Sequence, residues 1–235
     1  MKTNKLKSIV LASIFLGSIS FTSCEKDEPL VKDTPAPNIG LKFNTVTSPV
    51  LLKSTQQTKQ LSFSSGYIRL SELEFEAEKD NDLYEIEFEI EIDTKIDFAT
   101  GTTNPDISFI EIPAGTYNEI EVEIELYDED NSPAIVLYGT YTDVQGINHD
   151  VRFEYSSDET FEVEREGSIT FSENESALAQ ITFDPTVWFA EVQDAHLANA
   201  TKNNEGEIVI SESYNEDIYD IVEEGLELAS EIEFD

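Results

Sequence analysis

Tyr84-Glu85-Ile86-Glu87-Phe88-Glu89-Ile90-Glu91-Ile92 is the stretch of this chain that decides its fold. Apolar and acidic side chains alternate through it without a break, and the apolar series continues at Ile96 and Phe98. A period of two is typical of a β-strand with one buried face and one face in solvent. Strands of this length are unusual, so we expect a bend or a split near Thr94. The pattern predicts a half-buried strand whose outer face is a row of carboxylates.

The same alternation recurs on both sides of this stretch. Before it, residues 67–77 keep one phase up to Leu70 and the other phase from Leu73, which predicts a bulge at Ser71-Glu72. After it, residues 120–126 form another strand, with Glu119, Glu121, Glu123 and Glu125 on its polar side. Further short strands separated by turn residues are expected at 41–46, 107–112, 134–142, 149–155, 160–163 and 178–183. The repetition predicts a mainly β chain folded as an antiparallel β-sandwich.

The C-terminal part of the chain has a different pattern. Asp184 followed by Pro185 is typical of a helix start, and that helix would direct three residues inward, namely Trp188, Phe189 and Val192. Asn215 is expected to cap a second helix with an apolar stripe made of Ile218, Ile221, Val222, Leu226 and Ala229. Gly225 lies within that helix and lowers its propensity. We therefore expect a helical segment, 184–235, packed on a sandwich of residues 41–183.

One motif supports the sandwich by resemblance. Ile112-Pro113-Ala114-Gly115-Thr116-Tyr117, followed by an alternating strand, resembles a domain family of unknown function in bacterial lipoproteins. The resemblance covers residues 41–183 and implies a transthyretin-like or immunoglobulin-like β-sandwich. No activity is established for that family, so the resemblance assigns no functional residue here.

The N-terminus has the features of a secretory signal peptide. Lys2, Lys5 and Lys7 precede an apolar run, 9–19, that is too short to span a bilayer comfortably. Small residues then lead to Cys24, the only cysteine of the chain. We expect residues 1–23 to be removed, although an ordinary signal peptide with a chance cysteine nearby is the alternative.

Cys24 and its neighbours resemble the relaxed lipobox of Bacteroidetes lipoproteins. The resemblance implies that Cys24 carries acyl chains, which would anchor the protein without a transmembrane helix. Glu25-Lys26-Asp27-Glu28 resembles the charged signal that directs such lipoproteins to the cell surface. Residues 24–40 contain Pro29, Pro35 and Pro37, and are expected to form a semi-rigid tether.

The charge of the chain narrows the classes of partner. Its formal net charge is −36 at pH 7. Binding to nucleic acid depends on neutralising phosphates with Lys and Arg, so nucleic acid is excluded as a partner. Direct docking on anionic lipid head groups is disfavoured for the same reason. An affinity for cations is favoured.

The sequence contains no recognisable catalytic motif. His149 and His196 are its only histidines, and neither lies beside a nucleophile in a known arrangement. Carboxylates for glycoside hydrolysis are so abundant that they give no specific signal. We therefore expect no enzymatic activity, with a glycan-processing enzyme as the least favoured alternative.

Carboxylates also provide the candidate metal ligands. Asp128, Asp130 and Ser132 place oxygen ligands at alternate positions of an acidic turn, which suits calcium but lacks the remainder of an EF-hand loop. A solvated acidic turn is the favoured alternative, and no cofactor other than calcium is suggested. The two acidic strands leave two arrangements open: their rows are not neighbours, or cations lie between them, with Arg69, Lys79, Lys95, Arg152 and Arg165 interleaved. A solvated face is favoured over a cation-binding one.

Together these features predict a location and a class of function. We expect a lipid-anchored protein of the outer membrane that faces the cell exterior and binds or adheres to an unknown extracellular ligand. The alternative is a structural or accessory subunit of an outer-membrane assembly, whose partner would be an outer-membrane protein.

Overall fold

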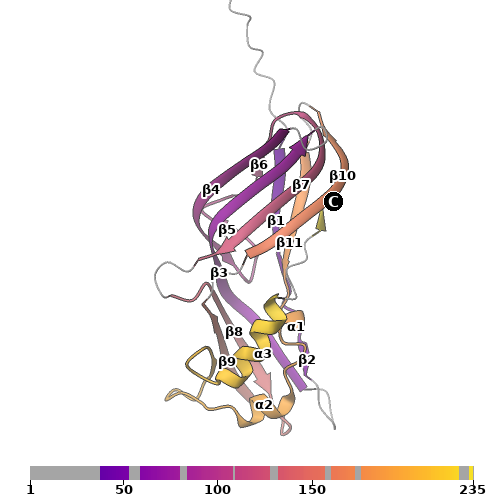
Figure 1. Ribbon diagram of the computed structural model, residues 1–235. Coiled ribbons are helices and arrows are strands. Elements are labelled where there is room, and N and C mark those ends of the chain that lie inside the picture. The colour runs from indigo at the N-terminus through magenta and orange to yellow at the C-terminus, as the bar shows by residue number, and fades with distance from the viewer. Residues whose placement is uncertain are drawn as a thin grey trace, which may run out of the picture. The chain divides into compact units, whose positions relative to one another are not determined.

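The computed structural model describes residues 38–52, 59–79, 84–107, 109–127, 132–156, 160–172, 176–227 and 233–234 (Figure 1). The strands are β1 Asn38–Thr45, β2 Val50–Leu52, β3 Lys59–Lys79, β4 Tyr84–Asp97, β5 Thr103–Asn104, β6 Phe109–Glu111, β7 Gly115–Leu126, β8 Ile135–Thr142, β9 Asn148–Tyr155, β10 Thr160–Phe171, β11 Ser176–Phe183, β12 Ile208–Ile210 and β13 Glu233–Phe234. The helices are α1 Pro185–Trp188, α2 Asp194–Asn199 and α3 Glu216–Glu227.

The strands form two sheets, and β3 is the longest strand of the larger one. The smaller sheet has the order β13-β11-β1-β6, and the larger one contains β10-β7-β3-β8-β9-β12 with β2, β4 and β5 attached. The first half of β3 pairs with β8, and its second half lies between β4 and β7. Figure 1 shows β1 and β11 as a second layer behind β4, β3, β7 and β10. The second half of β3 is therefore the centre of the layer that carries the acidic strands.

Alternate residues of these strands fill the core between the layers. Phe75 of β3 and Val122 of β7 are fully buried, as is Phe183 of the smaller sheet. The Trp188 ring of α1 packs edge-on against Phe183, and Phe189 contacts Phe63 of the larger sheet. The first helix therefore joins the aromatic side chains of both sheets.

The prediction of a mainly β chain is confirmed, as is the bulge. The register of β3 shifts between Leu70 and Glu72 against both neighbours, so the phase of β3 reverses at Ser71. Against β7, Ser71 is an extra residue, whereas against β4 it faces two residues, Ile92 and Asp93. Of the bend or split expected near Thr94, the split was wrong, because β4 runs through this position as one strand of 14 residues. The register of β4 against β3 does shift there, between Glu91 and Thr94. The Thr94 side chain is buried on the core face and donates a hydrogen bond to the Pro105 carbonyl at 2.8 Å.

An antiparallel arrangement throughout was also wrong, because both sheets are mixed. β1 runs parallel to β11, and β12 runs parallel to β9. A parallel pair needs a long crossover connection, and α1 and α2 lie in the connection that leads to β12. Residues 38–40 belong to β1, so the tether expected at 24–40 ends before them.

The helical prediction for residues 184–235 is correct in part. Asp184 accepts a hydrogen bond from the Thr186 N–H at 2.7 Å and caps α1, as expected. Gly225 has a packing role, since a Cβ there would lie 2.3 Å from the Trp188 carbonyl oxygen. The correction is that this segment also contributes strands, because β12 and β13 each join a sheet. Ala229 lies outside the described residues.

Candidate functional site

Glutamates stand side by side on four neighbouring strands of the larger sheet. In one row, Glu74 of β3 is opposite Glu89 of β4 on one side and Glu123 of β7 on the other, and Glu123 is opposite Glu162 of β10. The other rows are Glu91–Glu72–Glu125, Glu87–Glu76–Glu121–Glu164 and Glu85–Glu78–Glu119–Glu166. We call these positions the glutamate face.

The pleat of the sheet places the glutamates and the apolar residues of a strand on opposite sides. Successive side chains of a strand point to opposite faces, so the apolar residues between the glutamates point to the core. Leu73 is only 3% exposed, whereas Glu87, Glu89 and Glu91 are exposed and the described glutamates of β3 and β7 are partly exposed. β3 and β7 therefore bury one face and present their carboxylates on the other, and Glu87, Glu89 and Glu91 of β4 lie on the same outer side.

The carboxylates of this face disfavour one another's charge. Opposed side chains on paired strands have Cβ atoms about 4.5–5.5 Å apart, and like charges at that distance are destabilising. The pKa of Glu72 is raised to about 6, first by burial and then by the charges of Glu89 and Glu125. Burial and the neighbouring carboxylates, Glu123 first among them, also raise the pKa of Glu74. The face therefore favours bound protons or cations.

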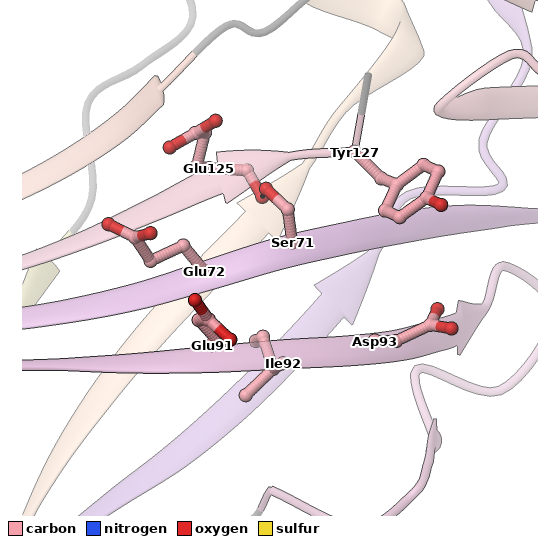
Figure 2. Close-up of a pocket in the computed structure, with 7 residues that line it drawn as sticks. All are labelled: Ser71, Glu72, Glu91, Ile92, Asp93, Glu125 and Tyr127. Atoms are coloured by element: carbon pink, nitrogen blue, oxygen red, sulfur yellow. Dashed lines mark hydrogen bonds between the residues drawn. The ribbon is translucent and has the colours of Figure 1, made fainter. Parts of the chain in front are cut away.

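The bulge opens a hollow of about 400 Å³ at one end of the face. Figure 2 shows Glu72 between Glu91 and Glu125 there, with Ser71 beside them and Asp93 and Tyr127 farther along the sheet. The Ser71 hydroxyl lies 3.2 Å from the Leu126 carbonyl oxygen, to which it donates a hydrogen bond. Ser71 thus lies between the three glutamates and the side chains of Asp93 and Tyr127 (Figure 2).

Two residues that line this hollow, Asp93 and Tyr127, bind one of the chain's own cations, Arg69. The Arg69 guanidinium donates to both carboxylate oxygens of Asp93, at 2.9 and 3.2 Å. Its central carbon lies 3.3 Å from the centre of the Tyr127 ring. Paired contact with a carboxylate and stacking on an aromatic ring are the two preferred ways to hold a guanidinium. This end of the sheet therefore holds the guanidinium of Arg69.

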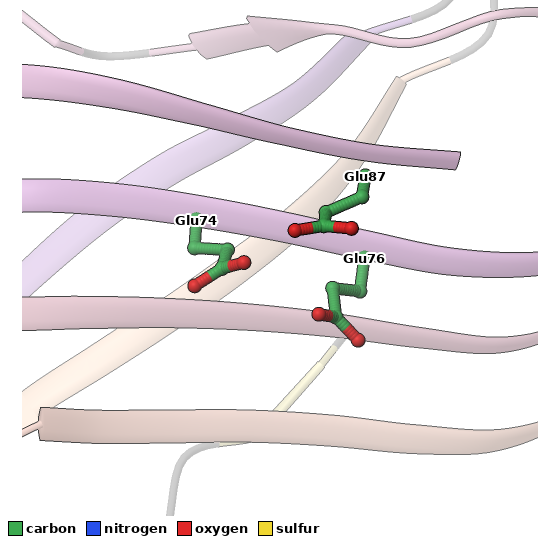
Figure 3. A group of neighbouring side chains, drawn as sticks. All are labelled: Glu74, Glu76 and Glu87. Carbon is green, nitrogen blue, oxygen red and sulfur yellow. The ribbon is translucent and has the colours of Figure 1, made fainter. Parts of the chain in front are cut away.

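Three carboxylates within the face could share one cation. Glu74, Glu76 and Glu87 each place an oxygen so that all three oxygens lie within 4.8 Å of one another (Figure 3). A calcium ion takes six to eight oxygen ligands, so water would have to supply the remainder. The trio is an incomplete ligand set on an open surface.

The structure shows whether the two acidic strands predicted from the sequence are neighbours. The β4 and β7 rows are not direct neighbours, because β3 lies between them, but β3 carries its own glutamates opposite both. Within the described register, the expected cations stand outside the rows: Lys95 is opposite Arg69, Lys79 opposite Tyr84 and Arg165 opposite Ile120, while Arg152 is on β9. The glutamates of β3, namely Glu72, Glu74, Glu76 and Glu78, were not predicted as part of this face, although they alternate with apolar residues in the sequence.

Most of the predicted site residues lie outside the described part of the chain. These are Cys24, Glu25, Lys26, Asp27, Glu28, Asp128 and Asp130. Ser132 is described and is partly exposed. The lipid anchor, the export signal and the calcium turn therefore stay predictions.

His149 lies in a separate polar cluster. Its Nε2 is 2.9 Å from an Asp143 carboxylate oxygen, and its Nδ1 is 2.7 Å from the Lys202 amine. The hydrogen bond from His149 lowers the pKa of Asp143, so the carboxylate accepts and Nδ1 is left to accept from Lys202. His196 accepts a hydrogen bond from the Gln193 N–H at the start of α2. The cluster ties the segment after α2 to the β8–β9 hairpin.

Comparison with known proteins found no matching family model, no matching curated protein and no matching solved structure. Among the helices that the structure describes, none is long and apolar enough to cross a membrane. Function is therefore inferred from the geometry of the glutamate face.

Proposed function

We propose that this protein is a lipid-anchored, surface-exposed binding protein whose glutamate face takes a cationic partner. The observation that carries the proposal is the register, which aligns glutamates across β4, β3, β7 and β10. A partner with several positive charges would neutralise neighbouring carboxylates together and relieve the repulsion between them.

Solubility alone does not account for this arrangement. A net negative charge keeps a protein soluble wherever the acids lie, and a mixed surface does so without repulsion between strands. Here the acids stand directly opposite one another, and that pairing costs stability. Departures from the local rules of stable folding are expected at functional sites. The alignment therefore favours a binding role over a merely solvated face.

The predicted anchor supports the same function. An acyl group on Cys24 would hold the protein at the outer membrane, and the charged run after it would direct the protein to the exterior. The glutamate face would then be available to a basic extracellular ligand or to the basic surface of an outer-membrane protein. Both are polycations, and the face recognises them by charge.

Binding of a defined polycation tests the proposal. Hexalysine is titrated against the purified protein at low ionic strength, and the Glu74→Gln/Glu123→Gln variant is compared with Glu205→Gln/Glu212→Gln. Both pairs remove two charges, but Glu205 and Glu212 are exposed residues outside the face. We expect only the first pair to weaken binding markedly. Equal weakening by both pairs would mean that hexalysine senses the net charge and that the face is not the site.

A further inference from the structure

The strand β4 forms an open edge of the glutamate face. Among the strands that the structure describes, residues 84–91 of β4 pair with β3 only, and β5 joins farther along at Lys95 and Ile96. Figure 1 shows β4 at the outer edge of its layer. An edge strand presents a row of backbone N–H and C=O groups that can pair with another chain.

The core side of this edge is incompletely covered. Ile90 is 41% exposed, although Leu73 directly opposite it on β3 is 3% exposed and Ile124 in the next strand is fully buried. Ile92 is also only partly buried. One more strand, about 4.7–4.9 Å beyond β4, would place its own side chains against Ile90.

The outer side of the edge restricts what that strand can be. Glu87, Glu89 and Glu91 are exposed there. A second copy that added its own β4 would place glutamates opposite glutamates, which is destabilising. A strand with Lys or Arg at alternate positions would place positive charges there instead, and the residues between them would point to Ile90.

We propose that the β4 edge binds an extended segment of a partner protein in which basic and apolar residues alternate. The proposal rests on the proposed function and narrows it from any polycation to a strand-forming one. In this mode of recognition, main-chain hydrogen bonds supply affinity and alternate side chains supply specificity. The carboxylates on the outer side of β4 would select basic residues, and Ile90 on the core side would select apolar ones.

Two peptides of identical composition separate strand addition from simple attraction. One is Lys-Val-Lys-Val-Lys-Val-Lys, and the other is Lys-Lys-Lys-Lys-Val-Val-Val, so their charges are equal. Several main-chain hydrogen bonds and the matched alternation should make the first peptide bind at least about tenfold more tightly. Equal affinities would overturn strand addition and leave the proposed function intact. Failure of both peptides to bind would contradict the proposed function as well.

A substitution at Ile90 gives opposite expectations for the two mechanisms. Ile90→Asp adds a negative charge, so simple attraction predicts unchanged or tighter binding of the alternating peptide. Strand addition predicts at least about a tenfold loss, because an inward-pointing charge on an edge strand blocks pairing. Ile90→Thr, which keeps a β-branched side chain, is the control and should retain most of the binding. Unchanged or tighter binding of the alternating peptide by Ile90→Asp would overturn the proposal. If that variant does not fold, the comparison of the two peptides on the unmodified protein tests the proposal.

Discussion

Replacing Glu74 by Gln should stabilise the protein, because the change removes one of the mutually repelling carboxylates from the middle of the glutamate face. Glu74 stands opposite both Glu89 and Glu123, and burial and neighbouring carboxylates raise its pKa. Relief of two opposed pairs, at about 0.2–1 kcal/mol each, gives a gain of about 0.5–2 kcal/mol. Gln preserves the size of the side chain, so the core beneath it is unchanged. For a chain of this size the gain corresponds to a rise in Tm of about 1–8 °C.

The assay is thermal unfolding at pH 7.5 in EDTA and a low concentration of potassium chloride. Glu205→Gln, on an exposed turn, is the matched control for net charge. The gain should fade toward 1 M salt, where the Debye length is about 3 Å. Calcium at matched ionic strength should add only a small shift, because the trio of Glu74, Glu76 and Glu87 is an incomplete ligand set. A Glu74→Gln variant that is no more stable than the control at low salt would refute the reasoning, since the face would then be neutralised from within the chain.

Three further predictions concern pH, packing and the anchor. The pKa of Glu72 is raised from 4.5 to about 6, so between these pH values the folded state binds more protons than the unfolded state. The free energy of unfolding should therefore fall as pH rises from 4.5 to 6. Solvent screening keeps this contribution below about 1 kcal/mol. Glu72→Gln should flatten this part of the stability curve, and an unaltered slope would show that other groups cause it. Gly225→Ala should destabilise the protein by about 1–3 kcal/mol, measured by denaturant unfolding, because the alanine Cβ would clash with the Trp188 carbonyl. Helix propensity alone predicts instead that the variant is about 1 kcal/mol more stable, and that result would contradict the packing role of Gly225. Cys24→Ala should release the protein from the outer membrane in cell fractionation or leave it unprocessed, and quantitative retention of the mature form would refute the acyl anchor.

The sequence predicted the longer strands and their faces, but it did not predict which strands are neighbours. Alternation reveals a buried face because the side chains of one strand point alternately to opposite faces. The bulge at Ser71 was predictable for the same reason, since a slip in phase is visible in one strand alone. The alignment of Glu74 with Glu89 and Glu123 is a property of three strands far apart in the chain, and no local pattern contains it.

The shorter strands were missed for a different reason. β12 and β13 have three and two residues, too few to show a period, and tertiary pairing alone makes them strands. From the sequence, Gly225 only lowers the propensity of its helix, whereas in the structure it permits the close approach of α3 to Trp188. The exposure of Ile90 could not be predicted either. The alternation places its side chain on the core side, and only the strand order shows that β4 is an edge strand there.

Carboxylate footprinting tests the role of the glutamate face most directly. The protein is treated with a carbodiimide and an amine, with and without saturating hexalysine, and the modified residues are identified by mass spectrometry. Glu87, Glu89 and Glu91 are exposed on the face, whereas Glu205, Glu212 and Glu216 are exposed elsewhere. We predict protection by hexalysine confined to the first group. Equal protection of both groups, or protection of the second alone, would contradict a binding site on the glutamate face.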